Sequence, residues 1–156
     1  MPANASTIPA FKAALATRLS ADASLTGVQI TYGLPFVSGP EREWIWLHDV
    51  SSWTQQSSSI GMQHREETYT LRIVISVMYE VRTTQQVTTE RAFTLAAAVE
   101  NSIRTWSQGA NVGNVFATAT TGVRSAEIVG TDFIETADSK DREARITLSL
   151  TVHARI

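Results

Sequence analysis

One segment, residues 66–81, alternates apolar and mixed side chains with a period of two along its whole length. Successive side chains of a β-strand point to opposite faces of a sheet, so this alternation predicts a long strand with one buried face. The segment is far longer than the usual ~5–6 residues of a strand, which predicts a strand that bends or projects past the body. The apolar set is Tyr69, Leu71, Ile73, Ile75, Val77 and Tyr79, and the mixed set is Thr70, Arg72, Val74, Ser76, Met78 and Glu80.

Two other segments follow helical spacing. Residues 7–22 place apolar side chains three and four positions apart, with Pro9 in the first turn, where its missing N–H costs little. Residues 88–107 carry a second apolar stripe, and a run of three alanines in its middle suits close packing onto a sheet. The two stripes are Ile8, Phe11, Leu15 and Leu19, and Ala92, Leu95, Ala96, Val99, Ile103 and Trp106.

Further strands are expected before and after the second helix. The chain of 156 residues, 43% of them hydrophobic, is long enough for one domain with a core, which we place over residues 1–156. The element order α-β-β-β-α-β-β-β predicts an α+β fold, a two-layer sandwich with an antiparallel sheet and two helices packed on one face. The additional strands are expected at 28–32, 43–50, 115–120, 123–135 and 143–156.

The strand expected at 43–50 is apolar on both faces, because Trp44 and Trp46 alternate with Ile45 and Leu47. It is either covered on both sides within its own fold, or its tryptophan face meets another subunit, where Trp is enriched. The following residues, 51–64, are mostly polar yet include Trp53. They predict a long projecting loop, a kind of segment that is often functional.

The sequence offers no catalytic constellation. It contains no cysteine, and its three histidines fall on different expected elements with no HExxH spacing. Neither GxSxG nor a P-loop motif is present. Acidic residues at strand ends stand beside arginines, as Glu66 and Glu67 do beside Arg65, which favours ion pairs over an acid–base pair. We therefore predict a protein that is not an enzyme and needs no metal or cofactor.

Charge and hydropathy argue against two classes of partner, nucleic acids and membranes. Thirteen Lys and Arg against fifteen Asp and Glu give a net charge of −2, which disfavours a nucleic-acid binder that neutralises many phosphates. No signal peptide or membrane-spanning stretch is recognisable, so we expect synthesis in a cytoplasm and no membrane partner.

Three short motifs carry a resemblance. They are Arg65-Glu66-Glu67-Thr68-Tyr69 before the long strand, Arg91-Ala92-Phe93 with Ala97-Ala98-Val99-Glu100 in the second helix, and Glu143-Ala144-Arg145-Ile146 with Ala154-Arg155-Ile156 at the end. With the opening helix and the element order, they make most of the chain resemble the small tail-terminator and neck proteins of long-tailed bacteriophages.

The resemblance implies a structural virion protein at the head–tail junction, made in the host cytoplasm. Such a subunit would form a hexameric ring that caps the tail tube, stops its polymerisation and presents a surface to the head connector. DNA would pass through the lumen without specific binding, which suits a near-neutral chain. The domain would be a single tail-terminator-like unit with its projecting loop at about 51–64.

We expect subunit and partner contacts at strand faces, strand ends and that loop. Trp53 would project from the loop onto a neighbour or the tube, and the charged residues would form ion pairs between subunits. The expected interface residues are Trp44, Trp46, Trp53, Arg65, Glu66, Glu67, Arg72 and Arg145.

Two alternatives stay open. The chain could be another neck part, such as a head-closure or connector protein, with a ring but a different neighbour. It could also be a small α+β ligand-binding domain or enzyme, a monomer or dimer whose cavity is lined by Trp44, Trp46, Tyr69 and His48.

Overall fold

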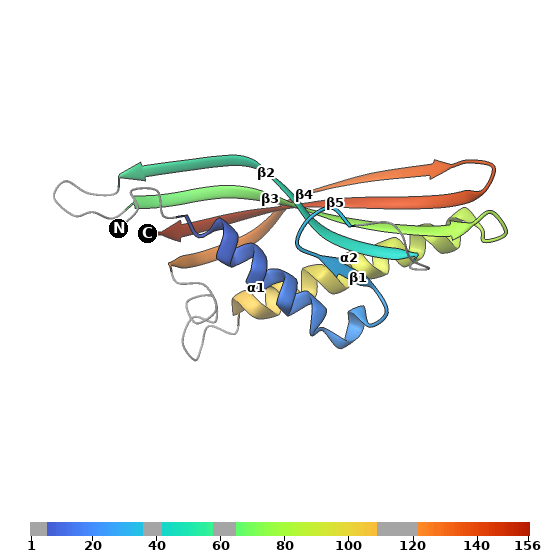
Figure 1. The fold of residues 1–156 in the computed structure, drawn as a ribbon, viewed down its shortest axis with the longest axis horizontal. Helices are drawn as coiled ribbons and strands as arrows, with labels where there is room; N and C mark the ends of the chain where they lie inside the picture. Colours follow the sequence, from blue (N-terminus) through green and yellow to red (C-terminus); the bar gives the residue numbers. More distant parts are fainter. Residues whose placement is uncertain (1–5, 36–41, 58–64, 109–121) are drawn as a thin grey trace.

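The computed structural model describes residues 6–35, 42–57, 65–108 and 122–156 (Figure 1). The strand expected at 115–120 lies outside these residues. The elements are α1 (Ile8–Ser20), a short 3-10 turn η1 (Ala23–Leu25), β1 (Gln29–Thr31), β2 (Glu43–Ser57), β3 (Arg65–Glu80), α2 (Gln85–Gln108), β4 (Val123–Ala137) and β5 (Asp141–Arg155).

The five strands form one sheet in the order β1-β2-β3-β5-β4. Both helices pack on the same face of this sheet (Figure 1), so the predicted α+β arrangement is confirmed. The prediction of a wholly antiparallel sheet is wrong, because the short β1 runs parallel to β2, with Ile30 opposite Ile45. Parallel neighbours need a connection of about a dozen residues, and residues 32–42 supply one of nearly that length.

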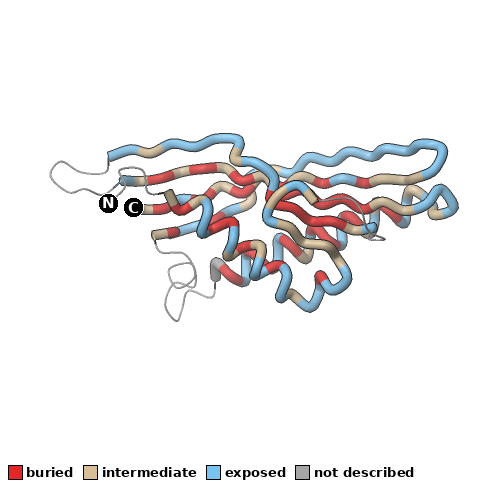
Figure 2. Tube along the Cα trace, viewed as in Figure 1, coloured by how far each residue is buried: buried red, intermediate tan, exposed pale blue. Residues whose placement is uncertain are grey.

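The core lies between the helices and the face of β3 that the alternation predicted. Tyr69, Leu71, Ile73, Ile75 and Val77 are all fully buried, and Figure 2 shows buried positions along the middle strands of the sheet. Phe11 of α1 joins the layers, since its ring stacks on Trp106 of α2 at 5.8 Å and meets Tyr69 edge-on at 6.2 Å.

Two boundaries differ from the sequence prediction. Residues 51–57, expected in a loop, continue β2 and pair with β3 up to Ser57 opposite Arg65. This extension has polar side chains and follows two register shifts between Leu47 and Ser52, so no regular alternation marks it in the sequence. The remainder of the expected loop, residues 58–64, lies outside the described residues. Helix α2 begins at Gln85 rather than at Thr88 or Thr89, and the Thr84 hydroxyl accepts the Val87 N–H at 3.4 Å.

The molecule is elongated, and its two long hairpins point in opposite directions (Figure 1). The far end of the β2–β3 pair lies on the side of the C-terminus and of the start of α1, and the turn between β4 and β5 lies at the other end. Residues 131–140 of that second hairpin are all exposed. The fold therefore presents two arms and two sheet edges to its surroundings.

Candidate assembly surfaces at the two sheet edges

Glu67 is a buried carboxylate on the helix-facing side of β3. Its Oε1 accepts hydrogen bonds from the Ser6 hydroxyl at 2.6 Å and from the indole Nε1 of Trp53 at 2.8 Å. Its Oε2 accepts the Thr7 N–H at 2.9 Å and the Thr7 hydroxyl at 2.7 Å. Glu67 thus acts within the subunit, joining the start of α1 to β2 and β3.

The charge state of Glu67 follows from these contacts. Burial alone would raise the pKa of Glu67, but the hydrogen bonds from Ser6, Thr7 and Trp53 favour the carboxylate and hold the pKa below its ordinary value. Thr7 makes no side-chain cap bond to its own helix. The carboxylate therefore takes the place of a cap at the positive end of α1.

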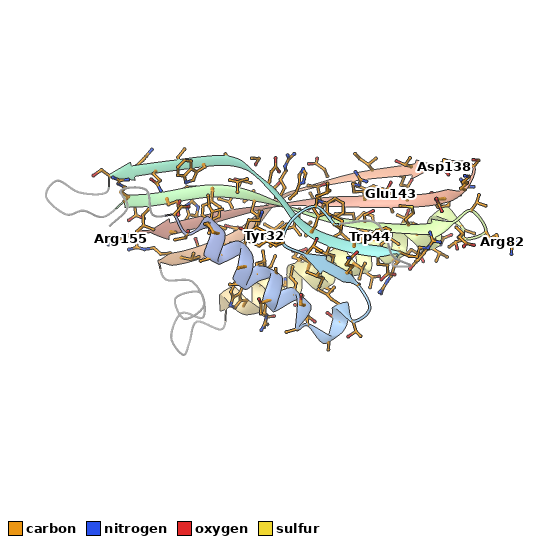
Figure 3. The ribbon with its side chains drawn as sticks, in the orientation of Figure 1. Tyr32, Trp44, Arg82, Asp138, Glu143 and Arg155 are labelled. Atoms are coloured by element: carbon orange, nitrogen blue, oxygen red, sulfur yellow. The ribbon has the colours of Figure 1, made fainter. Side chains whose placement is uncertain are left out.

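Trp53 keeps 52% of its surface exposed although its indole N–H is fixed by Glu67. It lies opposite Tyr69 in the β2–β3 pair and hence on the same face as the helices. Two other exposed apolar side chains follow β1, namely Tyr32 at 45% and Leu34 at 76%. Lys12 of α1 lies over the Tyr32 ring at 4.4 Å and donates to the His48 carbonyl at 3.1 Å. The α1 side of the sheet therefore carries an apolar surface (Tyr32 in Figure 3).

Trp44 and Trp46 lie on the face of the sheet opposite the helices, each only 6% exposed. They cluster with Val74 and Met78, and the Arg145 guanidinium lies 5.8 Å from the centre of the Trp46 ring. Of the two interpretations of this strand, its burial supports the one in which both faces are covered within the subunit.

The charged residues expected at subunit contacts have partners within the chain. Arg72 forms a bidentate ion pair with Asp49. Arg145 donates to Glu143 at 2.7 Å, and the Glu143 carboxylate also accepts the Ser76 hydroxyl at 2.8 Å. Glu66 lies 3.8 Å from Arg155, and the backbone of Arg65 pairs with Ile156. These arginines and Glu66 still lie at the surface.

The residues of the proposed ligand pocket are not brought together. Tyr69 is fully buried on the helix-facing side, whereas Trp44 and Trp46 lie on the other side of the sheet. His48 is exposed. The sheet itself separates these side chains, so they cannot line one cavity.

The opposite edge of the sheet carries the apolar residues that sequence reasoning missed. On β4, Val129 is 60% exposed and Ile134 61%. Phe133 of β4 meets Phe93 of α2 at 5.1 Å between ring centres, and both rings are also substantially exposed. In the sequence these residues are as apolar as the buried residues of β5, the strand that pairs with β4. They are exposed because β4 lies at an edge of the sheet and, for Ile134, because it points to the face opposite the helices (Figure 1).

Metal and membrane signals are absent from the part of the chain that the structure covers. No group of three or more His, Asp or Glu side chains among residues 6–35, 42–57, 65–108 and 122–156 could hold a metal ion. Among the same residues, no helix has the length and apolar character needed to span a membrane.

Comparison with known proteins gives a structural match. No protein-family model matches the chain, and no curated protein matches it either. Among solved structures, a chain from the "Virion of native gene transfer agent (GTA) particle" is similar over its full length. That match covers 98% of this chain and 100% of the other, with a TM-score of 0.57 and 16% sequence identity. The two chains therefore share a fold.

Proposed function

We propose that this chain is a structural virion protein, specifically a ring-forming tail terminator. In this role it caps the tail tube and joins the tube to the head connector, and six copies surround the passage for DNA. The observation that carries the proposal is the full-length structural match to a chain of a gene transfer agent virion, in which neither chain has a large part left over. The motifs around Arg65–Tyr69, in α2 and in β5 support the same assignment from sequence.

The surface chemistry fits a part that is assembled rather than one that turns over a substrate. Among the described residues, the sheet edges and hairpin ends are exposed, and they carry apolar as well as charged side chains. Two carboxyls with a lowered pKa, Glu43 and Glu67, are taken up by structural hydrogen bonds: Glu43 accepts from Arg91 and Tyr79, and Glu67 accepts from Thr7 and Trp53. The proposal therefore assigns no enzymatic activity.

Individual residues take different parts in this proposal. Trp53, Arg72 and Arg145 keep exposed surface and are proposed to contact neighbouring subunits or the tube, with Arg65 and Glu66 beside them at the strand ends. Glu67 acts inside the subunit, where it ties the start of α1 to the sheet, and Trp44 and Trp46 are buried on the sheet face opposite the helices.

A deletion of the gene from a genome that produces the particles tests the proposal. Electron microscopy should show tails of uncontrolled length and heads without tails, because nothing stops tube growth or offers a joint. Complementation with the intact gene should restore joined particles. Tails of normal length with leaking heads would instead assign the chain to head closure, and unchanged particles would contradict a virion role.

A further inference from the structure

β2 consists of two parts that are supported differently. Residues 44–47 are buried, and β1 pairs with residues 44–46 of this first part. We define the outer part of β2 as residues 50–57, which follow the register shifts after Leu47. None of its residues is buried (Figure 2), and its only strand partner among the described residues is β3. Segments with few buried side chains and exposed ladder hydrogen bonds open most easily in a native protein, so the outer part of β2 needs another support.

Trp53 and Gln55 attach the outer part of β2 to Glu67 of β3. The indole Nε1 of Trp53 donates to Glu67 Oε1 at 2.8 Å, and Gln55 Nε2 donates to the same oxygen at 3.3 Å. The hydroxyls of Ser51 and Thr54 reach backbone carbonyls of β3 only at 3.4 and 3.5 Å. Because hydrogen bonds to an ionised acceptor are stronger than those between neutral groups, the firmest of these side-chain attachments end on one carboxylate.

Glu67 is itself held by the two residues that precede α1. The Ser6 hydroxyl donates to Oε1 at 2.6 Å, and Thr7 donates its N–H and its hydroxyl to Oε2 at 2.9 and 2.7 Å. Thr7 is 5% exposed and Glu67 is 0% exposed, so these two side chains meet away from water. A hydrogen bond is stronger where water is excluded. Ser6 and Thr7 therefore strengthen the bonds that the carboxylate accepts from the outer part of β2.

We propose that Ser6 and Thr7 form a strap that fastens the outer part of β2 to the sheet through Glu67. With the strap in place, the carboxylate is dry and oriented toward Trp53 and Gln55. Without it, water reaches the carboxylate and competes for the same oxygens, so residues 50–57 open away from β3 while the rest of the sheet stays paired.

The open state changes what the sheet presents. Residues 65–71 of β3, which pair with the outer part of β2, then have free backbone N–H and C=O groups on that side. A free edge of this kind accepts strands from other chains, whereas the closed state hides it. The first residues of the chain thus control whether β3 is an inner strand or an edge strand at this end. This control is a property of the isolated chain and goes beyond the proposed virion role.

Hydrogen–deuterium exchange of the full chain, followed by mass spectrometry, tests the strap. The double variant Ser6→Ala/Thr7→Val removes both hydroxyls that Glu67 accepts, and valine keeps the branched shape of threonine. Thr17→Val is the matched control, since the Thr17 hydroxyl donates within α1, to the Ala13 carbonyl at 3.0 Å. Circular dichroism first establishes that each variant is folded.

We expect the amides of residues 50–57 to exchange at least ~10-fold faster in the double variant, as the loss of a hydrogen bond to a charged group implies. The amides of residues 44–47 should keep the rate of the unaltered chain, and Thr17→Val should change neither segment. Unchanged exchange over residues 50–57 would overturn the proposal. Equal acceleration of both segments in a folded double variant would also overturn it, because β2 would then open as one unit.

A second variant tests the strap from its other end and serves also if the double variant does not fold. Groups that are linked through one acceptor affect each other reciprocally. Trp53→Phe removes the indole N–H at a side chain that is 52% exposed and leaves an aromatic ring in place. Exchange of the Thr7 amide, which donates to Glu67 Oε2, is followed by NMR.

The Thr7 amide should exchange at least ~5-fold faster in Trp53→Phe than in the unaltered chain. Tyr32→Phe is the control for a change at an exposed aromatic side chain, since Tyr32 lies beside Lys12 of α1, and it should leave the Thr7 amide unchanged. Equal exchange of this amide in Trp53→Phe and in the unaltered chain would show that the two ends of the strap are independent and would overturn the proposal.

Discussion

Glu67 joins three segments that are distant in the sequence: the start of α1, the outer part of β2 and the middle strand β3. Its two oxygens accept hydrogen bonds from Ser6, Thr7 and Trp53, and Gln55 contributes another at 3.3 Å. A buried carboxylate with this many donors is stabilising as an anion, and its loss leaves those donors unpaired.

Glu67→Gln should therefore lower the free energy of unfolding by about 1–3 kcal/mol, because an amide cannot accept from all the donors that the carboxylate satisfies. Chemical denaturation at neutral pH measures the loss. Glu66→Gln is the matched control, since the Glu66 side chain is 42% exposed and its ion-pair partner among the described residues, Arg155, lies 3.8 Å away. Its effect should be under about 0.5 kcal/mol. Equal effects of the two changes would contradict the role given to Glu67.

Stability should also fall in acid. Hydrogen bonds from Arg91 lower the pKa of Glu43, with burial opposing them and Tyr79 assisting. The pKa of Glu67 is lowered as well. A carboxyl whose pKa is lower in the folded state adds stability above its unfolded pKa of about 4.3 and loses it as the pH falls through the folded pKa. Unfolding measured from neutral pH downward should show this decline. Glu67→Gln should make the decline shallower, and an unchanged slope would argue against it.

At the scale of single residues, the sequence showed that charged residues cluster at the start of β3 but did not show which of them would be buried. Arg65, Glu66 and Glu67 stand together in the chain, and alternation along β3 sends Glu67 alone into the interior. Its partners come from β2 and from residues just before α1, whose proximity depends on the assembled fold. No spacing in the sequence records that proximity.

Among the elements, β3 and β5 were predicted well because both alternate without interruption and pair with each other from Glu66–Arg155 to Glu80–Asp141. The outer part of β2 was missed because it is polar and bulged. A polar edge strand in a projecting hairpin is held by backbone hydrogen bonds to its partner strand. Its own side chains show no alternation of apolar and polar residues that would reveal it in the sequence.

The start of β4 offers a test at the scale of elements. Gly122 has a φ of +96°, and a Cβ there would overlap the carbonyl oxygen of Arg155. Gly122→Ala should cost more than about 2 kcal/mol, measured by thermal or chemical unfolding, because left-handed strain and a backbone clash combine.

Gly27→Ala separates the two causes. Gly27 has a φ of +86° with nothing within 4 Å of an added Cβ, so only the strain of about 1–2 kcal/mol applies. If the two variants lose the same stability, the close approach of β4 to the end of β5 is not a constraint.

At the scale of the whole molecule, the position of a strand within the sheet affects how far its apolar side chains are exposed. Phe133 and Ile134 of β4 match the apolar character of Ile146 in β5, yet β5 is central and β4 is at the edge. The sequence predicted strands and a helix-covered face. Which strand lies at an edge follows from the pairing of distant segments, so the exposure of Phe133 and Ile134 could not be predicted from the sequence.

Binding to DNA should be weak because of the net charge of the whole molecule. A net charge of −2 gives the chain no excess of cations with which to displace counterions from DNA. Fluorescence anisotropy with duplex DNA should show no binding at physiological salt up to micromolar protein. Tight binding that weakens steeply with added salt would indicate a phosphate-binding surface and contradict a passage that lets DNA slide.

The central position of β5 also governs how the chain folds. β3 can pair with β2 as a hairpin soon after synthesis, but its other side must wait for β5, which follows α2 and β4 in the chain. Ladders between such distant segments raise the contact order and make folding slower than that of a helical bundle of similar size. During that interval β3 has an open side of its own, so the chain must close its own sheet before a strand of a neighbouring chain pairs there.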